Sequence, residues 1–161
     1  MNEQGSGVKL GPFGDGALDK LEEFLAEISG ELALRRGGTQ LLGELGHPTE
    51  LARKIANAGE NSFVFAMTLN NALSGLIWAE IILNEFGERV CYVPVFAVLN
   101  DARRHGVGAN LFSALEEWVA SRDATAIEFT TLPGDRHTKN FCEANGLIAR
   151  SLKMYKPIKS S

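Results

Sequence analysis

The chain has 161 residues and is 45% hydrophobic, which is enough to build a proper core, and we take residues 1–161 as a single domain. The formal net charge of −4 argues against a nucleic-acid-binding protein, because such proteins are usually basic. No apolar stretch reaches the roughly 18–20 residues of a membrane span, no signal-peptide core is present, and the two cysteines match no disulfide framework, so we expect a cytoplasmic protein without a membrane partner.

The N-terminal part of the chain predicts a tail, a strand and a helix. Residues 1–7 are mostly polar and indicate a frayed tail, and residues 8–13 favour a short strand. From Asp15 onward, leucine and isoleucine recur at spacings of three and four residues, which indicates an amphipathic helical region. The Gly37-Gly38 pair is expected to end this region.

A second helix and three strands are expected next. Pro48 blocks extension of a helix backwards, so the helix is expected over residues 48–58 with Thr49 as its cap. Beyond it, apolar runs are separated by short polar turns, a pattern that is typical of strands joined in an antiparallel meander. The three strands are predicted over residues 61–69, 72–83 and 89–99.

The last third of the chain alternates helices with strands. Residues 107–122 and 136–145 have the spacing of helices, and residues 125–132 and 147–158 indicate strands, the second of which closes the fold. The expected order is therefore β-α-α-β-β-β-α-β-α-β. This order predicts an α/β fold of the α+β type, in which a mixed, mostly antiparallel sheet is flanked by helices.

Pro94 interrupts a run that otherwise indicates a central strand. Proline cannot donate a backbone hydrogen bond to a neighbouring strand, so it is tolerated at such a position mainly in a bulge. We therefore predict a bulge that splays this strand from its neighbour and opens a cleft.

The segment that follows this strand is Arg103-Arg104-His105-Gly106-Val107-Gly108-Ala109. A strand, a short glycine turn and the start of a helix form an anion site, because the first amides of the helix are free and the helix dipole favours negative charge. Gly106 and Gly108 let the backbone approach a phosphate without a Cβ in the way. The segment therefore predicts a site for a diphosphate.

The element order and this segment together resemble the GNAT superfamily of acyl-CoA-dependent N-acyltransferases, whose signature is Gln/Arg-x-x-Gly-x-Gly/Ala at a strand-to-helix turn. Here the signature runs from Arg103 to Gly108. The resemblance implies a GNAT-like fold and acetyl-CoA as co-substrate, with no metal. It also implies that the amides of the turn hold the coenzyme A pyrophosphate and that the preceding strand bonds to pantetheine. The cofactor-binding residues implied in this way are Phe96, Ala97, Val98, Arg103, Arg104, His105, Gly106, Val107, Gly108 and Ala109.

The last predicted helix departs from the family at three positions. The family commonly has Asn-x-x-Ala-x-x-aromatic/Leu-Tyr-Glu-x-x-Gly-Phe, and this chain has Asp135 for the Asn, Thr138 for the Ala and Cys142 for the Tyr. The resemblance implies that Asp135 and Thr138 belong to the cofactor-binding residues. The family's tyrosine is often assigned as the acid that reprotonates the coenzyme A thiolate, so here either Cys142 or water takes that role.

Glu80, Tyr92 and Cys142 are the candidate catalytic residues. Tyr92 occupies a strand position where some family members carry a glutamate base, but with a pKa of about 10 tyrosine is a poor base at neutral pH. Glu80 lies inside an apolar strand, where a carboxylate either faces solvent or works in the cleft, and Glu128 has the same two interpretations. Cys142 is either an acid or a small apolar residue packed near pantetheine.

Three further features bear on the chemistry: a main-chain N–H, a pair of arginines and the histidines. A main-chain N–H near Val98 is the expected oxyanion donor, since a splayed strand leaves it unpaired. Arg35 and Arg36 read as ordinary cations near a helix C-terminus, and contact with an acidic group of the substrate is the alternative. The three histidines are widely scattered, so no metal site is predicted.

The function predicted is the transfer of the acetyl group of acetyl-CoA to a primary amine, by direct attack through a tetrahedral intermediate. The acceptor is expected to be a small-molecule amine or, as the second choice, a peptide amine, and family habit allows a homodimer. The alternative is a sensor or interaction module that binds acyl-CoA without transferring the acyl group. A dinucleotide-binding oxidoreductase is disfavoured because Leu111 stands where the third glycine of its fingerprint would be.

Overall fold

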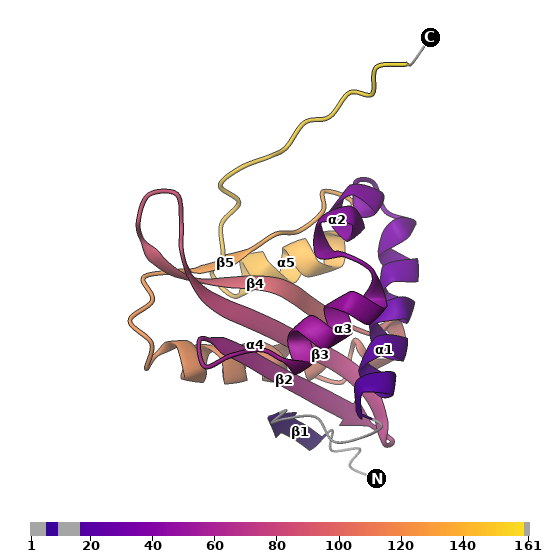
Figure 1. The fold of residues 1–161 in the computed structure, drawn as a ribbon, viewed down its shortest axis with the longest axis vertical. Coiled ribbons are helices and arrows are strands. Elements are labelled where there is room, and N and C mark those ends of the chain that lie inside the picture. Colours follow the sequence, from indigo (N-terminus) through magenta and orange to yellow (C-terminus); the bar gives the residue numbers. More distant parts are fainter. Residues whose placement is uncertain (1–5, 10–16, 160–161) are drawn as a thin grey trace.

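The computed structural model of the chain describes residues 6–9 and 17–159, which form a sheet with helices on both sides (Figure 1). The elements in chain order are β1 (Ser6–Lys9), α1 (Ala17–Ala33), α2 (Gly38–Leu45), α3 (Pro48–Ala56), β2 (Ser62–Leu69), β3 (Ala72–Leu83), β4 (Arg89–Val98), the short 3-10 helix η1 (Asn100–Ala102), α4 (Val107–Val119), β5 (Ile127–Phe129) and α5 (Arg136–Ala144).

Within the described residues the strands form one sheet in the order β1-β2-β3-β4-β5, so neighbours in the chain are also neighbours in the sheet. Strands β1 to β4 run antiparallel, and β5 runs parallel to β4. The turn between β2 and β3 is made by Asn70 and Asn71, both with positive φ, which is the backbone geometry that two-residue hairpins need. The predicted fold class, with a mixed and mostly antiparallel sheet, is confirmed.

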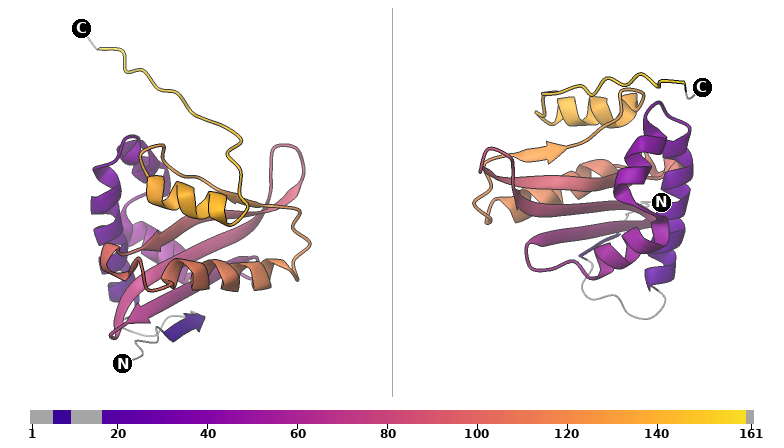
Figure 2. Two further views of the ribbon diagram at one scale, coloured as in Figure 1. Left: turned by 180° about the vertical axis from the view of Figure 1, so that it is seen from behind. Right: turned by 45° about the horizontal axis from the view of Figure 1, so that its top comes forward.

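Helices cover both faces of the sheet (Figure 2). Because successive side chains of a strand point to opposite faces, each central strand contributes to two cores. Helices α1 and α3 cover one core, and α4, with α5 beside it, covers the other. The first core includes Phe24, Leu25, Leu51, Ile55, Leu76 and Trp78. The second includes Phe63, Ile77, Val93, Leu111, Phe112 and Leu115.

Strand β4 bulges at Pro94, as the sequence predicts. Between the cross-strand pairs Trp78–Val95 and Glu80–Tyr92, β3 has one residue and β4 has two. The extra residue reverses the alternation of side chains, so that β4 packs under α4 before the bulge, whereas Val95 packs under α1 after it. Proline is therefore placed where its missing N–H interrupts no regular ladder.

The bulge also marks the place where β4 and β5 separate. Their parallel pairing extends only from Cys91–Ile127 to Val93–Phe129. From Val95 to Val98, β4 is paired with β3 but has no strand partner on its other side among the described residues. The predicted cleft is the space that this separation leaves open.

The structure corrects the predicted elements before β2. Ser6 and Gly7, expected in a tail, pair with β2 as part of β1, because strand pairing uses main-chain groups that every residue has. Residues 1–5 of the expected tail and 10–13 of the expected first strand lie outside the described residues. Helix α2 is additional to the two predicted helical stretches. It is eight residues long and bounded by glycines, which hides its pattern.

The cap of α3 also differs from the prediction. His47, not Thr49, is the cap: its Nδ1 accepts a hydrogen bond from the backbone N–H of Thr49 at 3.3 Å. Pro48 occupies the first helical position, where proline is favoured, and this moves the cap one residue earlier. The hydroxyl of Thr49 donates instead to Glu22 of α1.

The predicted closing strand over residues 147–158 does not form. Leu147 packs against the second core, but the described chain beyond it, residues 148–159, is exposed and leads away from the sheet (Figure 1). Strand β5 spans only three residues, shorter than predicted, and offers little edge for a further strand. Five large apolar side chains of this C-terminal segment are exposed: Ile148, Leu152, Met154, Tyr155 and Ile158.

Candidate functional site

The start of α4 presents backbone amides that have no acceptor. Gly106 precedes the helix with φ +73°, a left-handed conformation that glycine adopts without strain, and no side chain caps it. The first helical hydrogen bond is donated by Asn110 to the carbonyl of Gly106 at 3.0 Å. The amides of Val107, Gly108 and Ala109 donate to no acceptor in the described part of the chain. Such amides, with the helix dipole behind them, bind anions.

Gly75 fixes the position of this turn, and Gly108 lies at its contact with two aromatic rings. Gly75 of β3 faces α4, and a Cβ there would lie 2.4 Å from Cγ1 of Val107, so only glycine allows the helix to start this close to the sheet. Gly108 lies against the rings of Phe96 and Phe141, and a Cβ there would meet both at 3.5 Å, an ordinary contact. The free amides are therefore held on a rigid base of sheet and aromatic side chains.

A cavity of about 310 Å³ lies in front of these amides, between the C-terminal half of α1, the unpaired end of β4 and the N-termini of α4 and α5. Its lining includes almost the whole set of expected cofactor-binding residues, His105 being the exception. The lining members of that set are Phe96, Ala97, Val98, Arg103, Arg104, Gly106, Val107, Gly108, Ala109, Asp135 and Thr138.

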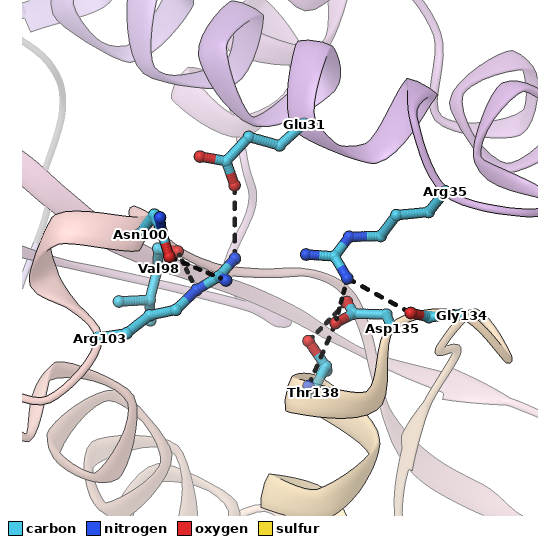
Figure 3. Close-up of polar contacts among 8 residues, drawn as sticks. All are labelled: Glu31, Arg35, Val98, Asn100, Arg103, Gly134, Asp135 and Thr138. Carbon is cyan, nitrogen blue, oxygen red and sulfur yellow. Dashed lines mark hydrogen bonds and ion pairs between the residues drawn. The ribbon is translucent and has the colours of Figure 1, made fainter.

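Arg103 reaches across this cavity to α1 (Figure 3). Its guanidinium forms an ion pair with Glu31 at 3.4 Å and donates through Nε to the carbonyl of Val98, also at 3.4 Å. Arg104 is exposed, with φ +112°, a conformation that a non-glycine residue rarely adopts. The sequence-predicted arginines thus lie at the cavity, and one of them already has a carboxylate partner.

A second ion pair joins the same end of α1 to α5 (Figure 3). Arg35 lies 3.4 Å from the carboxylate of Asp135, which is also the cap of α5. This carboxylate accepts hydrogen bonds from the backbone N–H of Thr138 at 3.3 Å and from its hydroxyl at 2.7 Å. Asp135 is therefore fully engaged, although it lines the cavity.

Glu31 and Arg35 were not among the predicted site residues, and Arg35 was expected to be an ordinary helix-end cation. Their partners are 72 and 100 residues away in the chain, so no local pattern indicates them. The available signal is their spacing of four residues, which places two opposite charges on one side of a helix end.

The main chain of β4 offers polar groups to the cavity. The amide of Leu99 donates to the carbonyl of Ser74 on β3 at 2.9 Å. Because main-chain groups alternate sides along a strand, the N–H of Val98 faces the other way, toward the side from which β5 has separated. The contact of Arg103 with the Val98 carbonyl is consistent with this direction.

Cys142 does not line the cavity. It is 7% exposed on α5 within the aromatic part of the core. Burial raises the pKa of its thiol, and the negative charges of Asp135 and Glu143 raise it further. The thiol is therefore protonated at neutral pH, and the packed environment corresponds to the interpretation of Cys142 as a small apolar residue.

Glu80, Tyr92 and Glu128 form one cross-strand row. Glu80 pairs with Tyr92 across β3 and β4, and Tyr92 pairs with Glu128 across β4 and β5. The row lies on the far side of the bulge from the pantetheine segment of β4, and none of the three lines the cavity. All three are partly exposed.

The described residues offer no cluster of three or more histidine, cysteine or acidic side chains that could hold a metal ion. Cys91 is fully buried in β4, and burial raises the pKa of its thiol to about 12. No helix in the described ranges has the length and hydropathy to cross a bilayer.

Comparison with known proteins supplies a family. The sequence profile of the acetyltransferase (GNAT) family matches residues 34–147. The chain is similar to the structure of a putative acetyl transferase from Pyrococcus furiosus, with 25% identity and a TM-score of 0.70 over 96% of this chain and 100% of that one. No curated protein sequence matches the chain.

Two further structures share the fold at lower identity. One is AAC(6')-Iy in complex with the bisubstrate analogue CoA-S-monomethyl-acetylneamine, with 14% identity and a TM-score of 0.66 over 98% of this chain and 99% of that one. The other is an aminoglycoside acetyltransferase from an uncultured soil metagenomic sample, with 18% identity and a TM-score of 0.65 over 97% and 99%.

Proposed function

The chain belongs to the GNAT acetyltransferase family, and from that premise we propose that it moves the acetyl group of acetyl-CoA to the primary amine of a small molecule. The observation that carries the proposal is the row of free amides on Val107, Gly108 and Ala109, which faces a cavity of about 310 Å³. These amides fit the pyrophosphate of a coenzyme A thioester, which needs N–H donors and positive charge.

The pyrophosphate is held by the first turn of α4 together with Arg103. In the absence of phosphate, Arg103 is paired with Glu31 at 3.4 Å. This pair is partly exposed, so it stabilises the protein by no more than about 1 kcal/mol, and the pyrophosphate, with one negative charge on each phosphate, can replace the carboxylate. Arg103 is thus kept oriented toward the cavity before the ligand arrives.

The unpaired end of β4 orients the pantetheine arm as an added strand would be oriented. Phe96, Ala97 and Val98 line the cavity, and β5 does not compete for their main-chain groups there. The thioester then lies near Pro94 and Val95. Along β4 the N–H of Phe96 faces the same side as that of Val98 and lies closer to the thioester, and we assign it to the oxyanion that forms when the amine attacks the carbonyl carbon.

The reaction needs two proton movements. The attacking amine loses one proton, and the departing thiolate gains one, so the two changes balance. We assign the first to water that is relayed toward Glu80 and Tyr92, which lie just beyond the bulge. The second goes to the thiolate from water, because Cys142 is buried in the core outside the cavity lining.

The similar structures support a small-molecule acceptor. Two of them are named as aminoglycoside acetyltransferases or hold an acetylneamine-linked analogue. We therefore propose a small amine in preference to a peptide amine.

A protein that binds acyl-CoA without transferring the acyl group is the second candidate. It is favoured by one observation: none of Glu80, Tyr92 and Cys142 lines the cavity. Release of coenzyme A thiol from acetyl-CoA, stimulated by an amine, separates the two functions. Stimulated release at a rate that depends on amine concentration rules out the sensor, and binding without release under every amine rules out the transferase.

Binding is tested by thermal unfolding with excess acetyl-CoA, with NAD as the control ligand. Saturation at a hundred times the dissociation constant stabilises the protein by about 2.7 kcal/mol, which raises the Tm of a chain of this size by roughly 5–11 °C. The expected result is a rise with acetyl-CoA alone. An unchanged Tm with acetyl-CoA contradicts the assignment of the α4 amides.

A further inference from the structure

A second, smaller cavity lies beside the first, at the bulge of β4. It measures about 60 Å³ and lies between α1, α2 and the ends of β4 and β5. The two cavities share part of their lining, so they adjoin each other. The shared residues are Ile28, Leu32, Phe96, Ala97, Asp135 and Thr138. A thioester held along β4 would therefore have its reacting end at the entrance of the smaller cavity.

The walls of this smaller cavity are apolar. Helix α2 contributes three leucines, Leu41, Leu42 and Leu45, which are half-buried because they face the cavity from across the cleft. Buried leucines of α1 and α3, Leu25 and Leu51, lie behind them. The polar side chains of the lining are hydroxyls and one carboxylate, that of Asp135.

That carboxylate is not available to an incoming cation. It caps α5, accepts the hydroxyl hydrogen bond of Thr138 and is paired with Arg35. An ammonium group that entered the cavity would leave water and find a neutralised partner among leucines, which is costly. A short apolar group would gain by leaving water in the same place.

We propose that this cavity selects the acceptor: a primary amine whose carbon chain is short, apolar and free of a second charge. The proposal rests on the acetyl transfer proposed above. Since the acetyl group adds only a methyl to the thioester, the apolar space beyond it is left to the substituent of the amine. A cavity of roughly 150 Å³ is known to hold benzene, so 60 Å³ suits an aliphatic group of a few carbons.

A matched pair of amines tests the selection. n-Butylamine and 1,4-diaminobutane have the same chain length and the same reacting group, but the diamine carries a second ammonium at the far end. Because its second ammonium stays in water, the diamine cannot bury about three of its methylene groups in the apolar cavity, and this lowers its affinity by about 50-fold. We expect kcat/KM for n-butylamine to exceed that for the diamine by about this factor, and the two affinities to differ likewise when each amine is titrated into the complex with coenzyme A, where no transfer occurs.

Two charge variants on α2 sharpen the test. Leu42→Asp places a carboxylate in the cavity wall and should reduce the preference for n-butylamine at least tenfold. Gln40→Asp adds the same charge to the same helix at an exposed position outside the lining, and should leave the preference unchanged. Should Leu42→Asp fail to fold, Leu42→Ala enlarges the cavity instead and should move the preference from n-butylamine toward n-hexylamine.

The outcomes separate this proposal from the proposed function. Equal use or equal binding of the two amines overturns the selection while leaving transfer intact. Use of butyryl-CoA as efficiently as acetyl-CoA, with no preference among amines, assigns the cavity to the acyl chain and also overturns it. Binding of n-butylamine that depends on Leu42, without any thiol release, supports the cavity assignment and refutes the transfer.

Discussion

The N-termini of two helices, α4 and α5, face the same cavity, but only one of them has its first backbone amides capped by a side chain of the chain itself. Helix α4 begins after Gly106 and leaves the amides of Val107, Gly108 and Ala109 without acceptors. Helix α5 begins at Asp135, whose carboxylate accepts from the backbone and hydroxyl of Thr138. Both helices carry the positive end of a dipole, but only α4 leaves it for an external anion.

The difference follows from one side chain at each helix start. A cap carboxylate neutralises the end of α5 and fixes it to Arg35 of the segment after α1. A glycine at the same place in α4 supplies neither charge nor hydrogen bond. A helix N-terminus thus becomes structural or ligand-binding according to whether the chain provides its own anion.

The largest expected effect comes from giving α4 an anion of its own. Gly108→Asp places a carboxylate on the first turn of α4, beside the rings of Phe96 and Phe141 in the cavity lining, where its negative charge repels the coenzyme. We expect the affinity for acetyl-CoA to fall by at least about 100-fold, since like-charge juxtaposition costs several kcal/mol, and the Tm of the free protein to fall as well, because the carboxylate is placed against two aromatic rings. Thermal unfolding with and without acetyl-CoA measures both.

Gly108→Ala is the matched control. Its Cβ meets Phe96 and Phe141 at 3.5 Å, an ordinary contact, so the variant should keep most of the binding. Equal loss in the Ala and Asp variants would show that bulk rather than charge is responsible, and would contradict the comparison of the two helix starts.

The reverse change removes the anion from α5. Asp135→Ala deletes the cap and the partner of Arg35, and should lower the free energy of unfolding by about 1 kcal/mol, which is roughly 2–4 °C in Tm. Asp135→Asn can still accept from Thr138 and should lose less. Denaturant unfolding of the free protein distinguishes them. The cap assignment fails if both variants are as stable as the parent.

A smaller effect is expected from Glu31, whose carboxylate occupies Arg103 and so competes with the phosphate for it. Glu31→Gln releases Arg103 from its ion pair and should tighten acetyl-CoA binding by about two- to fivefold, the range of a partly exposed pair. Glu27→Gln, one turn earlier and exposed, removes the same charge without that contact. Titration calorimetry at low salt measures both, and equal affinities in the two variants would mean that Glu31 does not compete.

The smallest effect is expected from the C-terminal segment, which contacts neither helix start. Deletion from residue 149 onward removes exposed chain whose described ion pair, Lys153–Glu44 at 3.6 Å, is itself exposed. We expect a change in unfolding free energy within about 0.5 kcal/mol and unchanged acetyl-CoA binding. A decrease of several kcal/mol in the free energy of unfolding, measured by chemical denaturation, would instead support the closing strand that the sequence predicts.

Much of the proposed coenzyme cavity could be predicted because its parts are local in the sequence. Pro94 inside an apolar run indicated the bulge, and the bulge determines where β4 and β5 separate. Gly106, which has a positive φ, indicated the turn before α4. In each case a backbone requirement, a missing N–H or a missing Cβ, is written in one residue.

The unpredicted parts depend on partners distant in the chain. Glu31 and Arg35 gain their roles only when α1 lies across the cavity from Arg103 and Asp135. The prediction of a closing strand was wrong for a related reason. The residue pattern along 147–158 indicates a strand, but β5 provides only a three-residue edge for it to pair with. A periodic pattern describes an element and does not supply its neighbour.

Gly75 extends the proposed coenzyme site into the back of the sheet. Its missing methyl is the space that Val107 fills, and Val107 carries the first free amide of α4. Replacing it by any larger residue would push the helix start outward and misalign the amides, although position 75 touches no ligand. A screen for inactive variants would therefore identify Gly75 together with the residues of the turn before α4. Its effect would look like that of a ligand contact, although its cause is the packing of α4 on the sheet.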